Sequence, residues 1–209
     1  TERPLLSTSI AQGQALRTAL DNGGLTAGDL DHLDLYSCFP VAVWSACEHL
    51  GLNPSDQALT VTGGLPFFGG PGNNYSLHAI AEMMSRIRAA PQSHGMVAAN
   101  GGYLSKHSVG IYTGHVHDVP RAAVATQPLP PPVRVTERAT GAARIESVAA
   151  IYQRSVPSSG VIIGRLDDDS RILALPADIH ALAALFRDDV CDRHVAVTHR
   201  ENLNYFNLL

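Results

Sequence analysis

The first half of the chain alternates stretches of helical and of strand-like hydrophobic spacing. In the helical stretches, apolar residues recur at helical intervals, and glycine follows the end of two of them. Pro40 favours a helix that begins there, because proline is well tolerated at the first helical position. The predicted helices cover residues 7–21, 40–50 and 75–88, and the predicted strands cover residues 33–36, 95–100 and 107–112.

The second half, from Gly141 onward, is dominated by short strand-like runs with one helical stretch among them. Tyr205 and Phe206 are interpreted as a continuation of the fourth strand. This pattern is typical of a small open barrel of the OB type. We expect strands at residues 145–152, 161–166, 171–175 and 194–198, a turn at 156–160 and a helix at 176–186.

A proline-rich segment separates the two halves. Residues 115–140 contain five prolines without helical spacing, which indicates a linker. The sequence therefore predicts an α/β part over residues 1–118, a linker over 119–140 and a small β domain with one helix over 141–209. A domain as small as the last is marginally stable alone, so we expect it to dock on the first part.

The bulk composition is that of a globular protein. Of the 209 residues, 45% are hydrophobic, and the net charge of −4 argues against a nucleic-acid partner, which would require a basic surface. No apolar run approaches the ~20 residues that span a bilayer, and no signal-peptide pattern opens the chain. The three cysteines form no paired framework, so a reducing, cytoplasmic location is expected.

The stretch from Leu59 to His78 is unusually rich in glycine. Glycine allows positive φ and close approach of the backbone to another group. The stretch therefore indicates either a shaped binding surface or a long turn between a strand and a helix. Its five glycines are Gly63, Gly64, Gly69, Gly70 and Gly72.

Cys38 precedes the helix predicted to begin at Pro40. The unpaired N–H groups and the positive dipole end of a helix N-terminus favour a thiolate. Cys38 is therefore a candidate nucleophile or acid/base. The alternative is a small, inert buried residue.

Other polar residues are weaker candidates. His78 falls in the first turn of a predicted helix, where a surface histidine is the alternative, and Asn100 precedes a glycine corner, where a turn asparagine is common. Residues 115–118 contain two histidines and an aspartate without further clustered ligands, so no metal site is predicted. Gly64 and Gly69 have P-loop spacing, but Gly-Pro follows them instead of Lys-Ser/Thr.

Three runs resemble, in order and spacing, the active-site loops in the C-terminal half of thiolases: DLYSCFP, TVTGGLPFFGGPGNNYS and NGGYLSKHS. They are most similar to thiolase-like proteins often called acetyl-CoA acetyltransferases, which are related to sterol-carrier-type thiolases. The resemblance covers residues 5–114, and residues 142–207 look like the additional C-terminal domain of these proteins. It implies a thiolase-fold C-terminal half, with a mixed sheet and covering helices, followed by a small OB-like β-barrel.

The resemblance also implies roles for single residues. Cys38 matches a cysteine that acts as acid/base, and Asn100 matches the asparagine of a second loop. Gly70 stands where the family's Gly-His-Pro loop has the histidine that activates the nucleophile, so His78 or His107 is a candidate substitute. The residues implied to contact substrate or coenzyme A are Tyr36, Gly63, Gly64, Gly69, Gly70 and Pro71.

The function implied is that of an acetyl-CoA acetyltransferase-like enzyme of lipid metabolism, which transfers acyl groups or makes and breaks carbon–carbon bonds in acyl-CoA thioesters. Coenzyme A or acyl-CoA is then substrate or ligand, with no covalently bound cofactor. The N-terminal thiolase half, which supplies the acylated cysteine, is an implied partner, in the same polypeptide or missing. A homodimer is one expected assembly. The alternatives are a non-catalytic acyl-CoA-binding protein and a scaffold subunit that recruits a partner through its C-terminal domain.

Overall fold

The computed structural model describes residues 1–55, 58–115, 128–187 and 189–209. Its contacts divide the chain into two compact units, one formed by Ser7–Leu129 and the other by Thr1–Leu6 together with Pro130–Leu209. This division differs from the predicted boundaries at the N-terminus, where the first six residues join the C-terminal unit. Among the described residues, no helix is both long and apolar enough to cross a bilayer.

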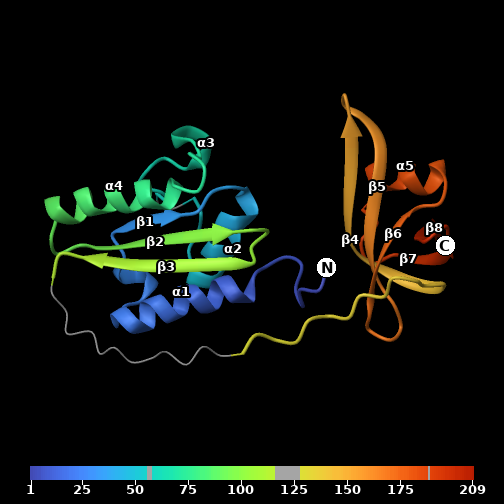
Figure 1. Cartoon of the computed structure of the whole chain (residues 1–209), viewed down its shortest axis with the longest axis horizontal. Helices are drawn as coiled ribbons and strands as arrows, with labels where there is room; N and C mark the ends of the chain where they lie inside the picture. Colours follow the sequence, from blue (N-terminus) through green and yellow to red (C-terminus); the bar gives the residue numbers. More distant parts are fainter. Residues whose placement is uncertain (56–57, 116–127, 188) are drawn as a thin grey trace. The chain divides into compact units, whose positions relative to one another are not determined.

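The Ser7–Leu129 unit is built on a three-stranded sheet in the order β1-β2-β3 (Figure 1). Strands β1 and β2 are parallel, and β2 and β3 form an antiparallel hairpin. The strands are β1 (His32–Leu35), β2 (His94–Gly101) and β3 (Lys106–Thr113), and the helices are α1 (Ile10–Gly23), η1 (Ala27–Asp29), α2 (Pro40–Leu50), α3 (Leu65–Phe68) and α4 (Tyr75–Ala89).

Helices cover both faces of this sheet (Figure 1). Met96 and Ala98 of β2 pack with α1 and α2 in one core cluster, whereas Val97 packs with α4 in another. The split follows from the strand period, which turns successive side chains to opposite faces. Leu16 of α1 and Met83 of α4 are completely buried, one on each side.

The helix ends follow the signals in the sequence. Ser9 caps α1 by accepting a hydrogen bond from Gln12 N, and Gly24 ends the helix in the left-handed conformation. Helix α2 begins at Pro40 and ends at Gly51, which also has positive φ, as predicted. These caps fix where the β1–α2 connection, which carries Cys38, enters the helix.

The C-terminal unit is a closed five-stranded barrel in the order β4-β5-β6-β8-β7. Helix α5 lies between β6 and β7 in the chain. The predicted fold class, an α/β part followed by a small OB-like barrel, is confirmed, but the barrel is closed and not open as expected, because β8 pairs with both β6 and β7. The elements are β4 (Gly141–Gln153), β5 (Val156–Arg165), β6 (Arg171–Pro176), α5 (Ile179–Arg187), β7 (His194–Arg200) and β8 (Leu203–Leu208), and the core includes the fully buried Ile145, Ile162, Ile172, Val195 and Phe206.

Two local predictions for the barrel are wrong. The turn expected at residues 156–160 lies within β5, and the reversal is made instead by Arg154 and Ser155, which have φ of 48° and 66°. Tyr205 and Phe206 do not continue the fourth strand. Glu201 and Asn202, which have positive φ, reverse the chain, and both aromatic residues belong to the next strand, β8. Hairpin turns with positive φ usually carry glycine or asparagine, and three of these four residues give no such signal.

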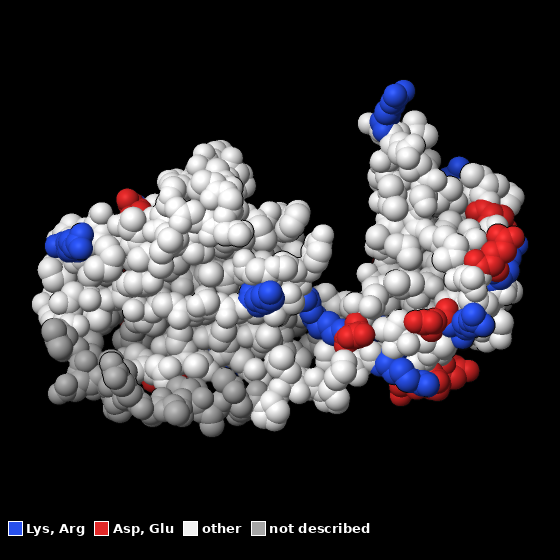
Figure 2. All heavy atoms as spheres, viewed as in Figure 1, with Lys and Arg blue, Asp and Glu red and all other residues white. Residues whose placement is uncertain are grey.

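A buried arginine ties the first residues of the chain to this barrel. Arg171, only 2% exposed, donates to the carbonyl oxygens of Thr1 (2.7 Å) and Pro4 (3.0 Å), and also to that of Arg3. Its Nε lies 2.5 Å from Glu146 Oε2, and Arg165 donates to the other carboxylate oxygen at 2.7 Å. On the face shown in Figure 2, most charged side chains of the molecule gather on this unit.

Candidate active site

Cys38 and Asn100 meet at the carboxyl ends of two neighbouring strands. Cys38 lies in the connection from β1 to α2, two positions before Pro40, and Asn100 lies near the end of β2. Because β1 and β2 are parallel, their carboxyl ends share one edge of the sheet, where binding sites in α/β folds occur. Asn100 Nδ2 lies 3.4 Å from Cys38 Sγ, within hydrogen-bond distance for sulfur. The structure thus joins two of the predicted site residues.

One polar atom of the Asn100 amide is unpaired. Its Oδ1 is buried and has no hydrogen-bond partner in the part of the chain that the structure describes. If the amide turns by 180°, Oδ1 accepts from the Cys38 S–H group and Nδ2 becomes the unpaired atom. In either orientation, one atom of the amide contacts the cysteine sulfur and the other has no partner among the described residues.

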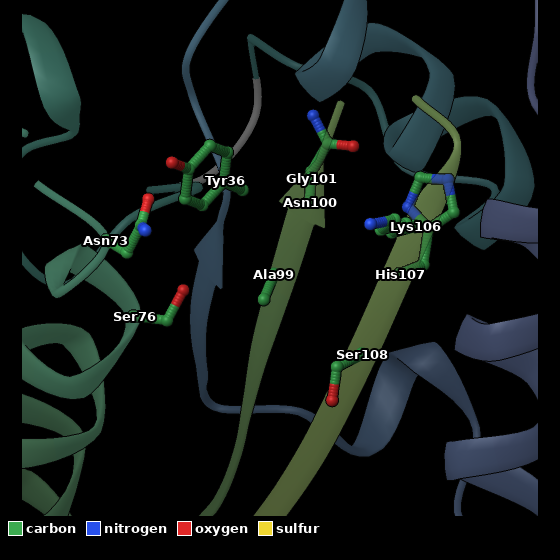
Figure 3. A pocket seen from close by; sticks show the side chains of 9 residues that line it. All are labelled: Tyr36, Asn73, Ser76, Ala99, Asn100, Gly101, Lys106, His107 and Ser108. Carbon is green, nitrogen blue, oxygen red and sulfur yellow. The ribbon is translucent and has the colours of Figure 1, made fainter. Parts of the chain in front are cut away.

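A pocket of about 380 Å³ opens beside Asn100 (Figure 3). Its walls come from the end of β1, the start of α4 and the β2–β3 hairpin, and they include polar side chains, the cation of Lys106 among them. The lining residues are Tyr36, Asn73, Ser76, residues 99–101 and residues 106–108. Of the predicted site residues, Tyr36, Asn100 and His107 therefore line the pocket, and Cys38 contacts one of them, Asn100.

The two candidate histidines differ in position. His107 pairs with Asn100 across the β2–β3 hairpin and so lies on the same sheet face, with its Nε2 3.2 Å from Ser9 Oγ. His78 is not among the lining residues. Its Nε2 accepts from Asn74 Nδ2 at 2.9 Å, and its ring contacts that of Phe68 edge-on. His107 is thus the better placed of the two.

The glycine stretch is a loop interrupted by the short helix α3. Gly63, Gly64 and Gly69 have φ of 89°, 86° and 91°, which other residues rarely adopt. A Cβ on Gly64 would lie 2.9 Å from Ser37 Oγ, the atom that accepts from Leu65 N. None of the five glycines lines the pocket, and neither does Pro71. Their predicted contact with substrate stays a prediction.

Gly70 differs from the other loop glycines. It lacks positive φ, and a Cβ placed there would meet only Leu65 Cδ2, at an ordinary 3.4 Å. The backbone therefore accommodates a side chain at this position. Steric space does not explain why glycine, and not histidine, stands here.

Sequence reasoning missed the carboxylate that supports this loop. Asp34, 0% exposed, accepts from Val61 N (3.0 Å), Thr62 N (3.3 Å) and Thr62 Oγ1 (3.1 Å) through Oδ2. Its Oδ1 accepts from Tyr75 OH at 3.0 Å. Burial raises the pKa of Asp34, and these hydrogen bonds oppose the shift without cancelling it. A polar residue within the apolar run of β1 was the only available signal.

Metal ligands are not clustered in the described residues, where no group of three histidine, cysteine, aspartate or glutamate side chains could hold an ion. The pair of His117 and Asp118 lies outside the described residues. His115 Nε2 is hydrogen-bonded to Gln92.

Comparisons with known proteins agree with the fold. Residues 119–202 match the family described as thiolase-like protein type 1 additional C-terminal domain. A solved structure described as a monomeric SCP2-thiolase like protein type 1 from Mycobacterium smegmatis matches 100% of this chain at 40% identity, with a TM-score of 0.88. No curated protein matches the chain.

The fold and these two matches identify a thiolase-like protein with an additional C-terminal domain. Within this class, the solved structure that this chain resembles is described as an SCP2-thiolase like protein type 1. This chain covers 47% of that relative, so it spans about half the length of the protein it matches. The predicted family is confirmed.

Proposed function

We propose that the protein binds acyl-CoA thioesters and that Cys38 transfers a proton at the carbon next to the thioester carbonyl. The observation that supports this proposal is the contact of Asn100 Nδ2 with Cys38 Sγ beside a pocket that Asn100 lines. The thiol at the carboxyl ends of the parallel strands is the group that can exchange a proton, and the amide positions it through a hydrogen bond.

The proposed proton transfer is balanced within the site. The Cys38 thiolate removes a proton from the α-carbon, which leaves an enolate on the substrate and a neutral thiol on the protein. The reverse step returns the proton to carbon. Before the transfer, the Asn100 N–H group stabilises the negative sulfur, because a hydrogen bond to the charged form favours that form.

Bond formation or cleavage between carbons needs a second, acylated cysteine. The resemblance to thiolases assigns that residue to the N-terminal half, so acyl transfer in lipid metabolism is proposed for the whole protein. Lys106, on the pocket wall, is placed to attract a negatively charged ligand such as coenzyme A.

A second candidate is non-catalytic binding of acyl-CoA. It is favoured by Gly70, which stands at the position of the family's activating histidine, and by His78, which is engaged with Asn74 and Phe68. A cysteine nucleophile needs an adjacent base or a lowered pKa. Both candidates share the ligand and differ in turnover.

Hydrogen exchange at the substrate separates the two. The full-length protein is incubated with acetyl-CoA in D₂O, and deuterium in the acetyl methyl group is followed by mass spectrometry. We expect catalysed exchange that Cys38→Ala reduces by about 100-fold or more. Cys191→Ala, an exposed cysteine in the barrel unit, is the matched control and should exchange normally.

Two other outcomes decide against the first candidate. Calorimetric binding of acetyl-CoA without exchange would favour the binding protein. Exchange that survives Cys38→Ala would remove the acid/base role from this cysteine.

A further inference from the structure

We propose that Asp34 is a positioning residue: by holding both ends of the loop from Gly63 to Asn74, it sets the pocket wall against which acyl-CoA binds. The identity of the ligand in this inference rests on the proposed function. The clamp itself, meaning the hydrogen bonds by which Asp34 holds Thr62 and Tyr75, does not depend on the proposed function and can be measured separately.

Both ends of the loop converge on this one carboxylate. Thr62, immediately before Gly63, donates its amide and its hydroxyl to Oδ2, and Tyr75, immediately after Asn74, donates its hydroxyl to Oδ1. Thr62 Oγ1 and Tyr75 OH are also 2.7 Å apart. Asp34, Thr62 and Tyr75 therefore close the loop at its base, as the close ends of an Ω-loop require.

The loop base continues directly into the pocket wall. Asn73 and Ser76, two residues before and one residue after the clamped Tyr75, line the pocket. The ring of Tyr75 meets the ring of Tyr36, a third lining residue, edge-on at 5.4 Å. Three of the nine lining residues are thus connected to Asp34 through Tyr75, either along the chain or by ring contact.

The choice of a carboxylate has a physical reason. The amides of Val61 and Thr62 both point at Oδ2, and an apolar side chain in this place would leave them without an acceptor. An asparagine keeps the volume but supplies only one oxygen. Its NH₂ group cannot accept from the Tyr75 hydroxyl, so the hydrogen bond at this end of the loop must reverse its direction, and we expect a weaker closure.

The test compares Asp34→Asn with two variants of its partner, Thr62→Val and Thr62→Ser, in the full-length protein. Thr62→Ser keeps the hydroxyl and serves as the conservative rescue. Met83→Ala is the matched control, because Met83 is completely buried on the same helix as Tyr75 and takes no part in the clamp.

The first readout is amide hydrogen exchange, which needs no ligand. We expect the amides of residues 63–74 to exchange about 10-fold faster in Asp34→Asn and Thr62→Val, while those of β2 stay protected. Thr62→Ser should behave like the unmodified protein. Unchanged loop exchange, or equal acceleration throughout the unit, would overturn the clamp.

The second readout is the dissociation constant of coenzyme A by calorimetry. We expect Asp34→Asn and Thr62→Val to weaken binding about 10-fold, since displaced contact groups are costly, and Met83→Ala to bind normally. A faster-exchanging loop with an unchanged dissociation constant would overturn the positioning role. If the unmodified protein binds no coenzyme A, the proposed function fails, and loop exchange alone decides whether Asp34 is a clamp.

Discussion

Two carboxylates, one in each unit, have pKa values shifted in opposite directions. Asp34 is completely buried and accepts only from neutral donors, and burial raises its pKa. Burial alone would also raise the pKa of Glu146, which is less deeply buried, but the hydrogen bonds and charges of Arg165 and Arg171 outweigh it and lower the pKa. The comparison teaches that charged partners can reverse the direction in which burial shifts the pKa of a carboxylate.

The groups next to the two carboxylates also differ in charge and in hydrogen bonding. Tyr75, beside Asp34, has its pKa raised to about 12, first by burial and further by the nearby carboxylate. Arg171, beside Glu146, is positively charged, and its other N–H groups donate to main-chain carbonyl oxygens. The site unit thus surrounds its carboxylate with uncharged donors at a loop, and the barrel pairs its carboxylate with two arginines, one of which also holds residues 1–4.

The largest expected effect breaks the ionic network. Arg171→Met should lower the free energy of unfolding by about 3–5 kcal/mol, because it leaves Glu146 partly unpaired and the Thr1 and Pro4 carbonyls without their donor. Urea denaturation measures the change. Arg134→Met is the control: its pair with Asp168 is exposed, so we expect a change of at most about 1 kcal/mol. Equal losses in both variants would contradict the comparison.

The stability contributions of Asp34 and Glu146 should depend on pH with opposite signs. Between the unfolded value of 3.8 and the higher folded pKa of Asp34, the native state binds more protons, so this residue's contribution to stability falls as pH rises. Glu146, lowered from 4.5, contributes stability that is present above that value and lost as pH falls through the folded pKa. Each group changes stability by at most about 1.4 kcal/mol per pH unit.

Difference curves separate the two contributions. The free energy of unfolding is measured between acidic and neutral pH for the unmodified protein, Asp34→Asn and Glu146→Gln. Subtracting the Asp34→Asn curve should yield a contribution that declines with rising pH, and subtracting the Glu146→Gln curve one that rises. The same sign in both curves would remove the distinction.

The smallest expected effects concern two glycines of the loop that Asp34 holds. Gly70→Ala should change the free energy of unfolding by no more than about 0.5 kcal/mol, because its φ and its surroundings accept a Cβ. Gly64→Ala should cost about 1–2 kcal/mol, because its φ is 86° and Ser37 Oγ lies in the way. Thermal unfolding of the two variants tests this order, and a Gly70→Ala loss as large as that of Gly64→Ala would contradict it.

The sequence predicted those features that depend on neighbouring residues. The helix at Pro40, its end at Gly51 and the barrel strands all carry local signals. The meeting of Cys38 with Asn100 was expected only through resemblance to thiolases. Spacing alone does not say that two residues 62 positions apart lie within 3.4 Å.

The features that escaped prediction depend on distant parts of the chain. Asp34 looked like the polar position of an alternating strand, but α4 covers it and supplies Tyr75. Arg171 was predicted only as the first residue of a strand, yet its acceptors lie about 170 positions earlier in the sequence. The turn at Arg154 and Ser155 is imposed by the register of β4 with β5, against the local preferences of both residues.

The contact between Arg171 and the first residues also has a practical consequence for handling the protein. Its three acceptors are main-chain oxygens of Thr1, Arg3 and Pro4, so this anchor is indifferent to the side chains it holds. Replacing those residues should preserve the attachment, whereas deleting them should not. Without residues 1–6 every barrel strand would remain, but the buried guanidinium of Arg171 would lose its main-chain acceptors and keep only Glu146 as a partner. Any fragment of the barrel unit is therefore better designed to include these residues.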